Sequence, residues 1–290
     1  MLYIALLTIH APQAAVPRLI RYEKAVVTPT SHTIQGNRSV ATFDSASWTY
    51  VIEVDLQSAE RTVRKLEGRG WAYFPKGEGV SMARLPSLSF LPPDRAQKSY
   101  SPHLDLFPMK EATATIFKNR LVASEEERIL WSMEGDFVHA AFGPGSDGES
   151  FFVLNGEDRK QALRRFSFDG KERGKPSELS PDVRSTGFPY LSIAPLDEAS
   201  LVTFVTYGEG YYKAHPMKTI LVGQGPDQER EDGYRFSVVR LDKDTGQMKE
   251  LSRFAWPDNV HSHAIRGALA MRGRKAYAWL QGGLYEIATE

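Results

Sequence analysis

The chain has 290 residues, of which 41% are hydrophobic and 25% are charged, and its 36 lysines and arginines balance its 36 aspartates and glutamates. This neutral balance gives no global electrostatic reason to bind nucleic acid, so we expect no nucleic-acid partner. The absence of cysteine excludes disulfides, thiolate catalysis, zinc–thiolate sites and iron–sulfur clusters.

The first 17 residues fit two interpretations. Residues 2–9 form an apolar run and residues 11–15 supply small side chains, which together suit a secretory signal peptide and its cleavage site. No lysine or arginine precedes the run, however, and the same residues suit a buried first strand. The first interpretation predicts a secreted or periplasmic protein, and the second leaves a cytoplasmic location open. No segment reaches the roughly 18 apolar residues of a transmembrane helix, so we expect no membrane span.

From residue 18 onward, short runs of β-branched and aromatic residues alternate with polar turns, and amphipathic helices are scarce. Three hairpins share one plan, in which a strand ends in Asp, a turn follows, and a second strand ends in Leu. They span residues 49–66, 164–179 and 236–251. A second type of hairpin, with a shorter or glycine-rich turn, spans residues 142–154, 193–205 and 268–280.

Joined together, the two hairpin types give four-stranded units at residues 137–179 and 190–252, and a unit of three strands at residues 261–289. A four-stranded antiparallel unit of about 40–50 residues that recurs along a chain is typical of a β-propeller blade. The missing strand of the last unit predicts that an N-terminal strand, residues 18–27, completes that blade and closes the ring.

We therefore predict an all-β fold, with a single β-propeller domain over residues 18–290 after the N-terminal segment 1–17. Six blades are expected, with five or seven as alternatives. The candidate innermost strands begin near residues 32, 70, 103, 139, 190 and 261. Two long excursions, residues 69–110 and 207–233, interrupt the pattern, and long loops on a rigid scaffold often carry function.

Two turns, Asp169-Gly170 and Asp242-Lys-Asp-Thr-Gly246, resemble turns of known propeller families. They resemble the turns of the propellers described as Tyr-Val-Thr-Asn, TolB-like and amine-dehydrogenase-like repeats, and the resemblance covers most of the chain from about residue 30. It implies the fold and carries over no catalytic residue, because this turn chemistry is shared by proteins of many functions. Residues 143–148 also match G-x-G-x-x-G, but a strand-like run follows where a dinucleotide site needs a helix, so we predict a hairpin turn.

Histidines offer the clearest candidate chemistry. Four of the seven, His32, His103, His139 and His263, fall near the start of a proposed innermost strand. Such strand starts converge on one mouth of a propeller's channel, where imidazoles from several blades can hold a divalent metal ion or act as acid and base. The alternative is that these histidines are structural or lie on the surface.

Two functions follow from this pattern. The first is a binding or scaffold protein that recognises a small molecule, a glycan or a protein through one face of the ring, with Tyr211, Tyr212 and Arg266 as ligand-binding residues. The alternative is a metal- or histidine-assisted hydrolase, lyase or cyclase at the channel mouth, with His139 and His263 as catalytic residues. We favour the binding protein, because a scaffold requires nothing that the sequence fails to show.

Overall fold

The computed structural model describes most of the predicted strands. The residues it describes are 16–23, 29–45, 47–69, 71–76, 79–84, 106–109, 112–117, 120–125, 128–135, 141–145, 147–157, 160–179, 183–184, 193–207, 235–254, 267–280 and 282–290. These residues form 23 strands, and none of them is helical. The part of the chain that the structure describes accordingly contains no helix of the length and hydrophobicity needed to cross a membrane.

Antiparallel pairing joins these strands into six sheets. The first sheet consists of β2 (Ser31–Gln35), β3 (Arg38–Asp44), β4 (Trp48–Asp55) and β5 (Arg61–Glu67). The second consists of β6 (Trp71–Lys76) and β7 (Gly79–Arg84). The third consists of β8 (Leu106–Met109), β9 (Ala112–Phe117), β10 (Arg120–Glu125) and β11 (Arg128–Glu134).

The remaining three sheets repeat the plan. The fourth consists of β12 (Ala141–Pro144), β13 (Ser150–Glu157), β14 (Lys160–Ser167) and β15 (Ser177–Glu178). The fifth consists of β16 (Val183–Arg184), β17 (Ile193–Pro195), β18 (Ser200–Tyr207), β19 (Arg235–Asp242) and β20 (Met248–Phe254). The sixth consists of β21 (Gly267–Arg272), β22 (Lys275–Leu280), β23 (Gly283–Ala288) and β1 (Arg18–Tyr22).

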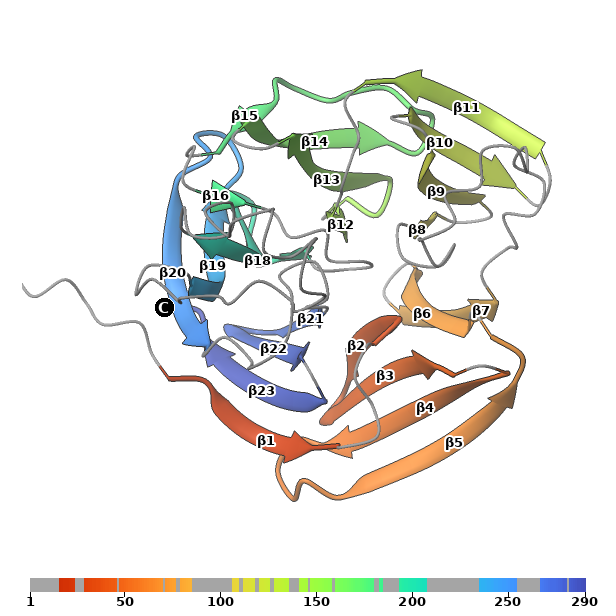
Figure 1. The fold of residues 1–290 in the computed structure, drawn as a ribbon, viewed down its shortest axis with the longest axis vertical. Helices are drawn as coiled ribbons and strands as arrows, with labels where there is room; N and C mark the ends of the chain where they lie inside the picture. Colours follow the sequence, from red (N-terminus) through yellow and green to blue (C-terminus); the bar gives the residue numbers. More distant parts are fainter. Residues whose placement is uncertain are drawn as a thin grey trace, which may run out of the picture.

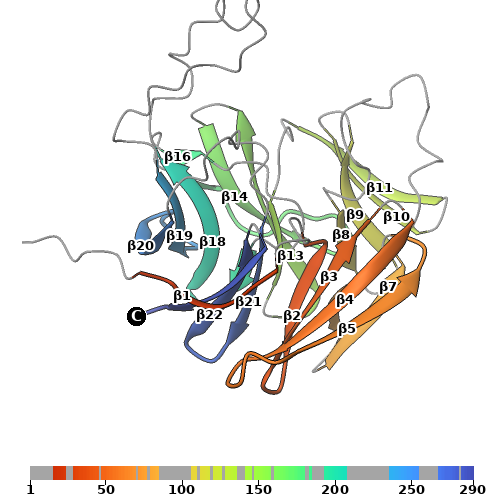
Figure 2. The ribbon, with the colours of Figure 1, turned by 60° about the horizontal axis from the view of Figure 1, so that its bottom comes forward.

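The sheets follow one another around a common centre, with β2, β8, β12 and β21 toward the middle and β5, β11 and β1 at the rim (Figures 1 and 2). This arrangement is that of a β-propeller, so the predicted fold class is confirmed. The expected inner strands near residues 32, 70, 103, 139 and 190 correspond to β2, β6, β8, β12 and β17. The described part of the second sheet has two strands, so the count of six blades, the closed ring and the single domain stay predictions.

The hairpin predicted at residues 143–148 is present. Strand β12 ends at Pro144 and pairs with β13, which begins at Ser150, so the glycine-rich segment is followed by a strand. Within the turn, the Asp147 carboxylate accepts hydrogen bonds from the Ser150 hydroxyl at 2.6 Å and from Arg165 at 2.7 Å. The pattern matches turn chemistry and lacks the helix start that a pyrophosphate site requires.

The N-terminal strand β1 is the outer strand of the sixth sheet. Strand β1 pairs antiparallel with β23, as the missing fourth strand of the last unit predicts. Directly after β1, the buried carboxylate of Glu23 pairs with Arg21 and with Arg61 of the first sheet. Arg21 also donates a hydrogen bond of 2.7 Å to the Ala59 carbonyl. Since a buried carboxylate is costly without its partners, these contacts hold the end of β1 against the first sheet.

A series of hydrogen bonds crosses the apolar interface between the first and sixth sheets. The Trp279 indole donates a hydrogen bond to the Ser39 hydroxyl at 2.9 Å, and that hydroxyl lies 2.9 Å from His32 Nε2. His32 Nδ1 lies 3.3 Å from the Ala268 carbonyl oxygen, which can only accept. The Nδ1–H tautomer therefore donates to Ala268 while Nε2 accepts from Ser39, which satisfies every group with a neutral imidazole. Burial lowers the pKa of His32 from 6.5 to about 3, outweighing the hydrogen bond to Ala268.

This histidine predicts a specific loss of stability in acid. The unfolded chain protonates His32 below pH 6.5, whereas the folded chain does so only near pH 3. The free energy of unfolding should therefore fall as the pH drops through this window, by up to about 1.4 kcal/mol per pH unit from this group, and should not change from it above pH 6.5. Urea denaturation at a series of pH values should show a smaller acid dependence for His32→Gln than for the parent chain. Equal acid dependence in the two proteins would contradict this account.

Candidate functional site

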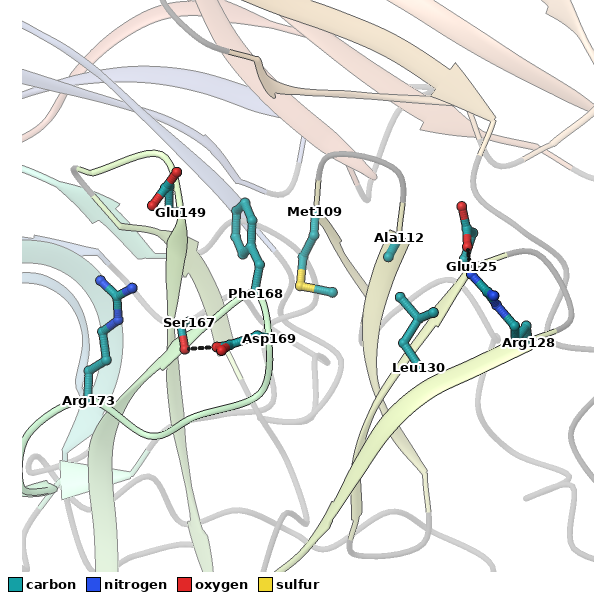
Figure 3. Close-up of a pocket in the computed structure, with 10 residues that line it drawn as sticks. All are labelled: Met109, Ala112, Glu125, Arg128, Leu130, Glu149, Ser167, Phe168, Asp169 and Arg173. Carbon is teal, nitrogen blue, oxygen red and sulfur yellow. Dashed lines mark hydrogen bonds and ion pairs between the residues drawn. The ribbon is translucent and has the colours of Figure 1, made fainter.

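A cleft of about 570 Å³ lies between the third and fourth sheets (Figure 3). Its lining residues are Met109, Ala112, Glu125, Arg128, Leu130, Glu149, Ser167, Phe168, Asp169 and Arg173. They lie at or beside the connections β8–β9, β10–β11, β12–β13 and β14–β15. In an antiparallel sheet, the connection after the first strand and the one after the third lie at the same end of the strands. The cleft therefore opens on one face of the propeller.

An aromatic core supports the cleft. The buried rings of Phe107, Phe142 and Phe151 come from β8, β12 and β13, and the centroids of Phe107 and Phe151 are 5.2 Å apart. Phe168, which lines the cleft, packs on this group at 6.4 Å from Phe151. Because close-packed aromatic rings resist rearrangement, Phe168 stands on a rigid base. In Figure 3 Phe168, Met109 and Leu130 lie between the charged residues of the two sheets.

The wall of the fourth sheet is fixed by a contact with Trp131. The Trp131 indole of β11 donates a hydrogen bond of 2.8 Å to the Phe168 carbonyl oxygen. Gly170, two residues later, has a φ of +84°, and a Cβ at this position would lie 2.7 Å from the Trp131 ring. A side chain at residue 170 is therefore disfavoured both by the backbone conformation and by the ring.

The opposite wall contains a β-bulge. Ala123 of β10 pairs with Trp131, but the next residue, Ser124, pairs with Ile129, which leaves Leu130 as the extra residue of β11. Strict alternation would point Leu130 and Trp131 to opposite faces of the sheet. The bulge changes this direction, so that Leu130 lines the cleft while its neighbour Trp131 contacts the fourth sheet.

Four of the five charged side chains that line the cleft are held by ion pairs. Glu125 pairs with Arg128 across the β10–β11 turn, and Arg173 pairs with Asp147 at 3.0 Å. Asp169 accepts a hydrogen bond from the Ser167 hydroxyl and pairs with the exposed Lys171 at 2.8 Å. The hydrogen bonds from Lys171 and Ser167 lower the pKa of Asp169 to about 2, so this carboxylate is ionised at neutral pH. The lining thus carries three carboxylates and two guanidinium groups.

Of the predicted site residues, the structure describes His32. Its two ring nitrogens are engaged with Ser39 and Ala268 in the core, and a role as metal ligand would require it to give up one of these contacts. The described residues contain no group of three His, Asp or Glu side chains placed to hold a metal ion. The other predicted residues, His103, His139, His263, Tyr211, Tyr212 and Arg266, lie outside the described residues, so their roles stay predictions.

The sequence interpretation did not find the cleft. The Asp169-Gly170 turn is predicted correctly, but no local pattern shows that it faces Trp131 of another sheet. The one signal in the sequence is the apolar run Ile129-Leu130-Trp131 beside a charged turn. Such a run is also typical of an ordinary buried strand, and only the sheet order shows that it belongs to an outer strand.

Comparisons with known proteins find structural similarity without a sequence match. No family model matches the chain, and no curated protein matches it. Hydrazine synthase of Kuenenia stuttgartiensis is 13% identical over 95% of this chain and 76% of its own, with a TM-score of 0.45. A luciferin-regenerating enzyme is 9% identical over 94% and 95%, with a TM-score of 0.49, and the WD40 domain of Toxoplasma gondii coronin is 7% identical over 94% and 83%, with a TM-score of 0.45. At TM-scores below 0.5 these likenesses carry no argument about function, and the fold rests on the sheets themselves.

Two glycines of the β14–β15 connection provide a matched test of the Trp131 contact. Both have positive φ, +84° at Gly170 and +80° at Gly174, but a Cβ at Gly174 would meet nothing within 4 Å. Gly174→Ala should lower the free energy of unfolding by about 1 kcal/mol, the cost of a left-handed alanine. Gly170→Ala should lower it by a further 1–3 kcal/mol or so, because the methyl group also displaces the Trp131 ring. Urea denaturation followed by circular dichroism measures both, and equal losses would show that the contact is not tight.

Proposed function

We propose that the protein is a β-propeller binding or scaffold protein that takes its ligand in the cleft between the third and fourth sheets. The supporting observation is an open volume of about 570 Å³ that combines apolar side chains with a few charged ones. Ligand pockets typically have volumes of about 300–1,000 Å³ and this mixture of groups. The apolar residues provide contact area, and the charged residues at either side set the orientation of the ligand.

The rigidity of the cleft also favours binding. Phe168 rests on the aromatic core, its backbone is held by Trp131, and the bulge fixes the direction of Leu130. A site whose side chains are already placed loses little conformational entropy when a ligand enters, so more of the contact energy is available as affinity. The enzymatic alternative depends on His139 and His263, which lie outside the described residues, and it stays a prediction.

A single introduced thiol tests this proposal, because the natural chain has no cysteine. Leu130→Cys places a thiol in the cleft, where it can carry a dye whose fluorescence reports its surroundings. The labelled chain should show a saturable change with at least one member of a panel of oligosaccharides, nucleotides, small amines and short peptides, since a ligand in the cleft displaces water around the dye. Fluorescence titration measures the change.

The matched control is Val63→Cys with the same dye. Val63 lies on β5, the outer strand of another sheet, and is 45% exposed, compared with 43% for Leu130. A ligand that changes both dyes equally binds the dye or the general surface. A panel in which no member changes the dye at residue 130 selectively would overturn the proposal that this cleft is the binding site.

A further inference from the structure

We propose that the ligand of this cleft is an uncharged saccharide. Its hydroxyl groups bond to the charged side chains at either side of the cleft, and the C–H faces of its rings lie on the apolar residues between them. This inference rests on the proposed function, because it names the class of ligand for the same site. Three features support it: the charge balance of the cleft, the hydrogen-bonding capacity that its ion pairs leave unused, and the arrangement of its apolar residues.

The cleft and its ion-pair partners carry no excess charge. The lining has three carboxylates and two guanidinium groups. Around it, the carboxylate of Asp147 pairs with Arg165 as well as with the lining, and Lys171 pairs with the lining too. The total is four carboxylates and four cationic groups, and the neighbouring pair of Arg164 with Glu172 adds no net charge. A ligand with a net charge therefore meets no complementary excess in this cleft.

A charged ligand has to compete with these ion pairs. Glu125 is paired with Arg128, and Asp169 is paired with Lys171. A cationic ligand that takes one of these carboxylates leaves the displaced arginine or lysine without its partner, and an anionic ligand does the same to a carboxylate. One ion pair then replaces another, while the charge of the ligand loses its hydration. An uncharged ligand leaves the ion pairs intact and avoids this cost.

The paired groups keep hydrogen-bonding positions for an uncharged ligand. A carboxylate has several lone-pair sites and a guanidinium has several N–H donors, so a single ion pair occupies only part of either group. Glu125 and Arg128 on one wall, and Asp169 and Arg173 on the other, are all partly exposed. Each wall thus offers both donors and acceptors. Hydroxyl groups match such walls, because a hydroxyl both donates and accepts hydrogen bonds.

Apolar side chains occupy the middle of the cleft. Phe168, Met109 and Leu130 lie between the charged residues of the two walls (Figure 3). A saccharide ring has the corresponding distribution of groups, because its C–H groups form apolar faces and its hydroxyl groups surround its edge. A ring that lies on the middle of the cleft therefore directs hydroxyl groups toward both walls. Phe168 is already held in place by Phe151, so little conformational entropy is lost when the ring binds.

The open side of the cleft also suits a saccharide. The cleft opens on one face of the propeller, beside the short connections between strands. A small apolar molecule normally has about 70–90% of its surface buried in its pocket. A saccharide needs less enclosure, because the hydroxyl groups on its outer side stay hydrogen-bonded to water.

Matched tetrasaccharides test the inference on the full chain. The uncharged probes are tetrasaccharides of glucose, mannose, galactose and N-acetylglucosamine. Tetragalacturonate and tetraglucosamine, titrated at about pH 6, are their anionic and cationic counterparts. At least one uncharged probe should give a saturable change in the dye at Leu130→Cys and none at Val63→Cys. Both charged probes should bind at least about ten-fold more weakly than this one. Its affinity should change by less than about two-fold between roughly 0.02 M and 0.5 M sodium chloride, because no ion pair forms with the ligand.

Two substitutions in the unlabelled chain, measured by calorimetry, test the role of the charge balance. Glu125→Gln leaves Arg128 without its carboxylate and gives the cleft a positive excess. Tetragalacturonate should then bind at least about five-fold more tightly than it binds the parent chain. Glu134→Gln is the matched control, because it removes an ion pair with Arg120 at the other end of the same two strands. It should leave all affinities unchanged, and circular dichroism confirms that both variants are folded.

Each other outcome counts against the inference. If the dye at residue 130 responds to a nucleotide, a small amine or a peptide but to no uncharged saccharide, the inference is wrong and the proposed function stands. Equal or tighter binding of a charged tetrasaccharide by the parent chain also overturns it, as does an affinity that falls about ten-fold over the range of salt. Equal effects of Glu125→Gln and Glu134→Gln contradict the role of the charge balance. If nothing in the panel or among the tetrasaccharides binds, both proposals fail.

Discussion

The fourth, fifth and sixth sheets each have two apolar faces, and the rest of the architecture depends on that constraint. Strand β13 shows it most clearly, because its residues Phe151, Phe152, Val153 and Leu154 are all buried. Phe151 and Val153 pack with the third sheet, whereas Phe152 and Leu154 pack with the fifth. A single antiparallel sheet with water on one side would expose half of these side chains. Each such sheet therefore needs a neighbour on either side, as a blade of a β-propeller has.

The cleft is a local departure from this packing. At the level of Phe107 and Phe151 the third and fourth sheets are in contact, with the centroids of these two aromatic rings 5.2 Å apart. At the strand ends that carry these connections, the hydrogen bond between Trp131 and Phe168 bridges the two sheets. Beside this hydrogen bond the sheets separate and leave the cleft. The same aromatic cluster thus closes the core and forms the base of the candidate site. Binding at this position needs no separate scaffold, because the residues that stabilise the fold also hold the site in place.

The sequence predicts the strands and turns better than it predicts the partners of each side chain. Alternating residues and Asp-initiated turns depend on a few neighbouring positions, so the hairpins were found correctly, as was the pairing of β1 with the last unit. His32 depends on Ala268, which is 236 residues away, and on a hydroxyl that also serves Trp279. A histidine at the start of an inner strand looks the same in sequence whether it faces a channel or a neighbouring sheet. The cleft is hidden for a related reason, since it requires a bulge and a contact between sheets that no local pattern encodes.

The pairing of β1 with β23 has a consequence for how the chain is made. Strand β1 leaves the ribosome among the first described residues, and its partner β23 leaves among the last. Until β23 has been synthesised, the exposed apolar residues Leu19 and Tyr22 and the acidic Glu23 have no strand to pair with. Long-range pairings of this kind make folding slow and leave unpaired edges open to aggregation in the meantime. The intervening sheets can assemble one after another on the nascent chain, but β1 gains its partner only after β23 has been synthesised.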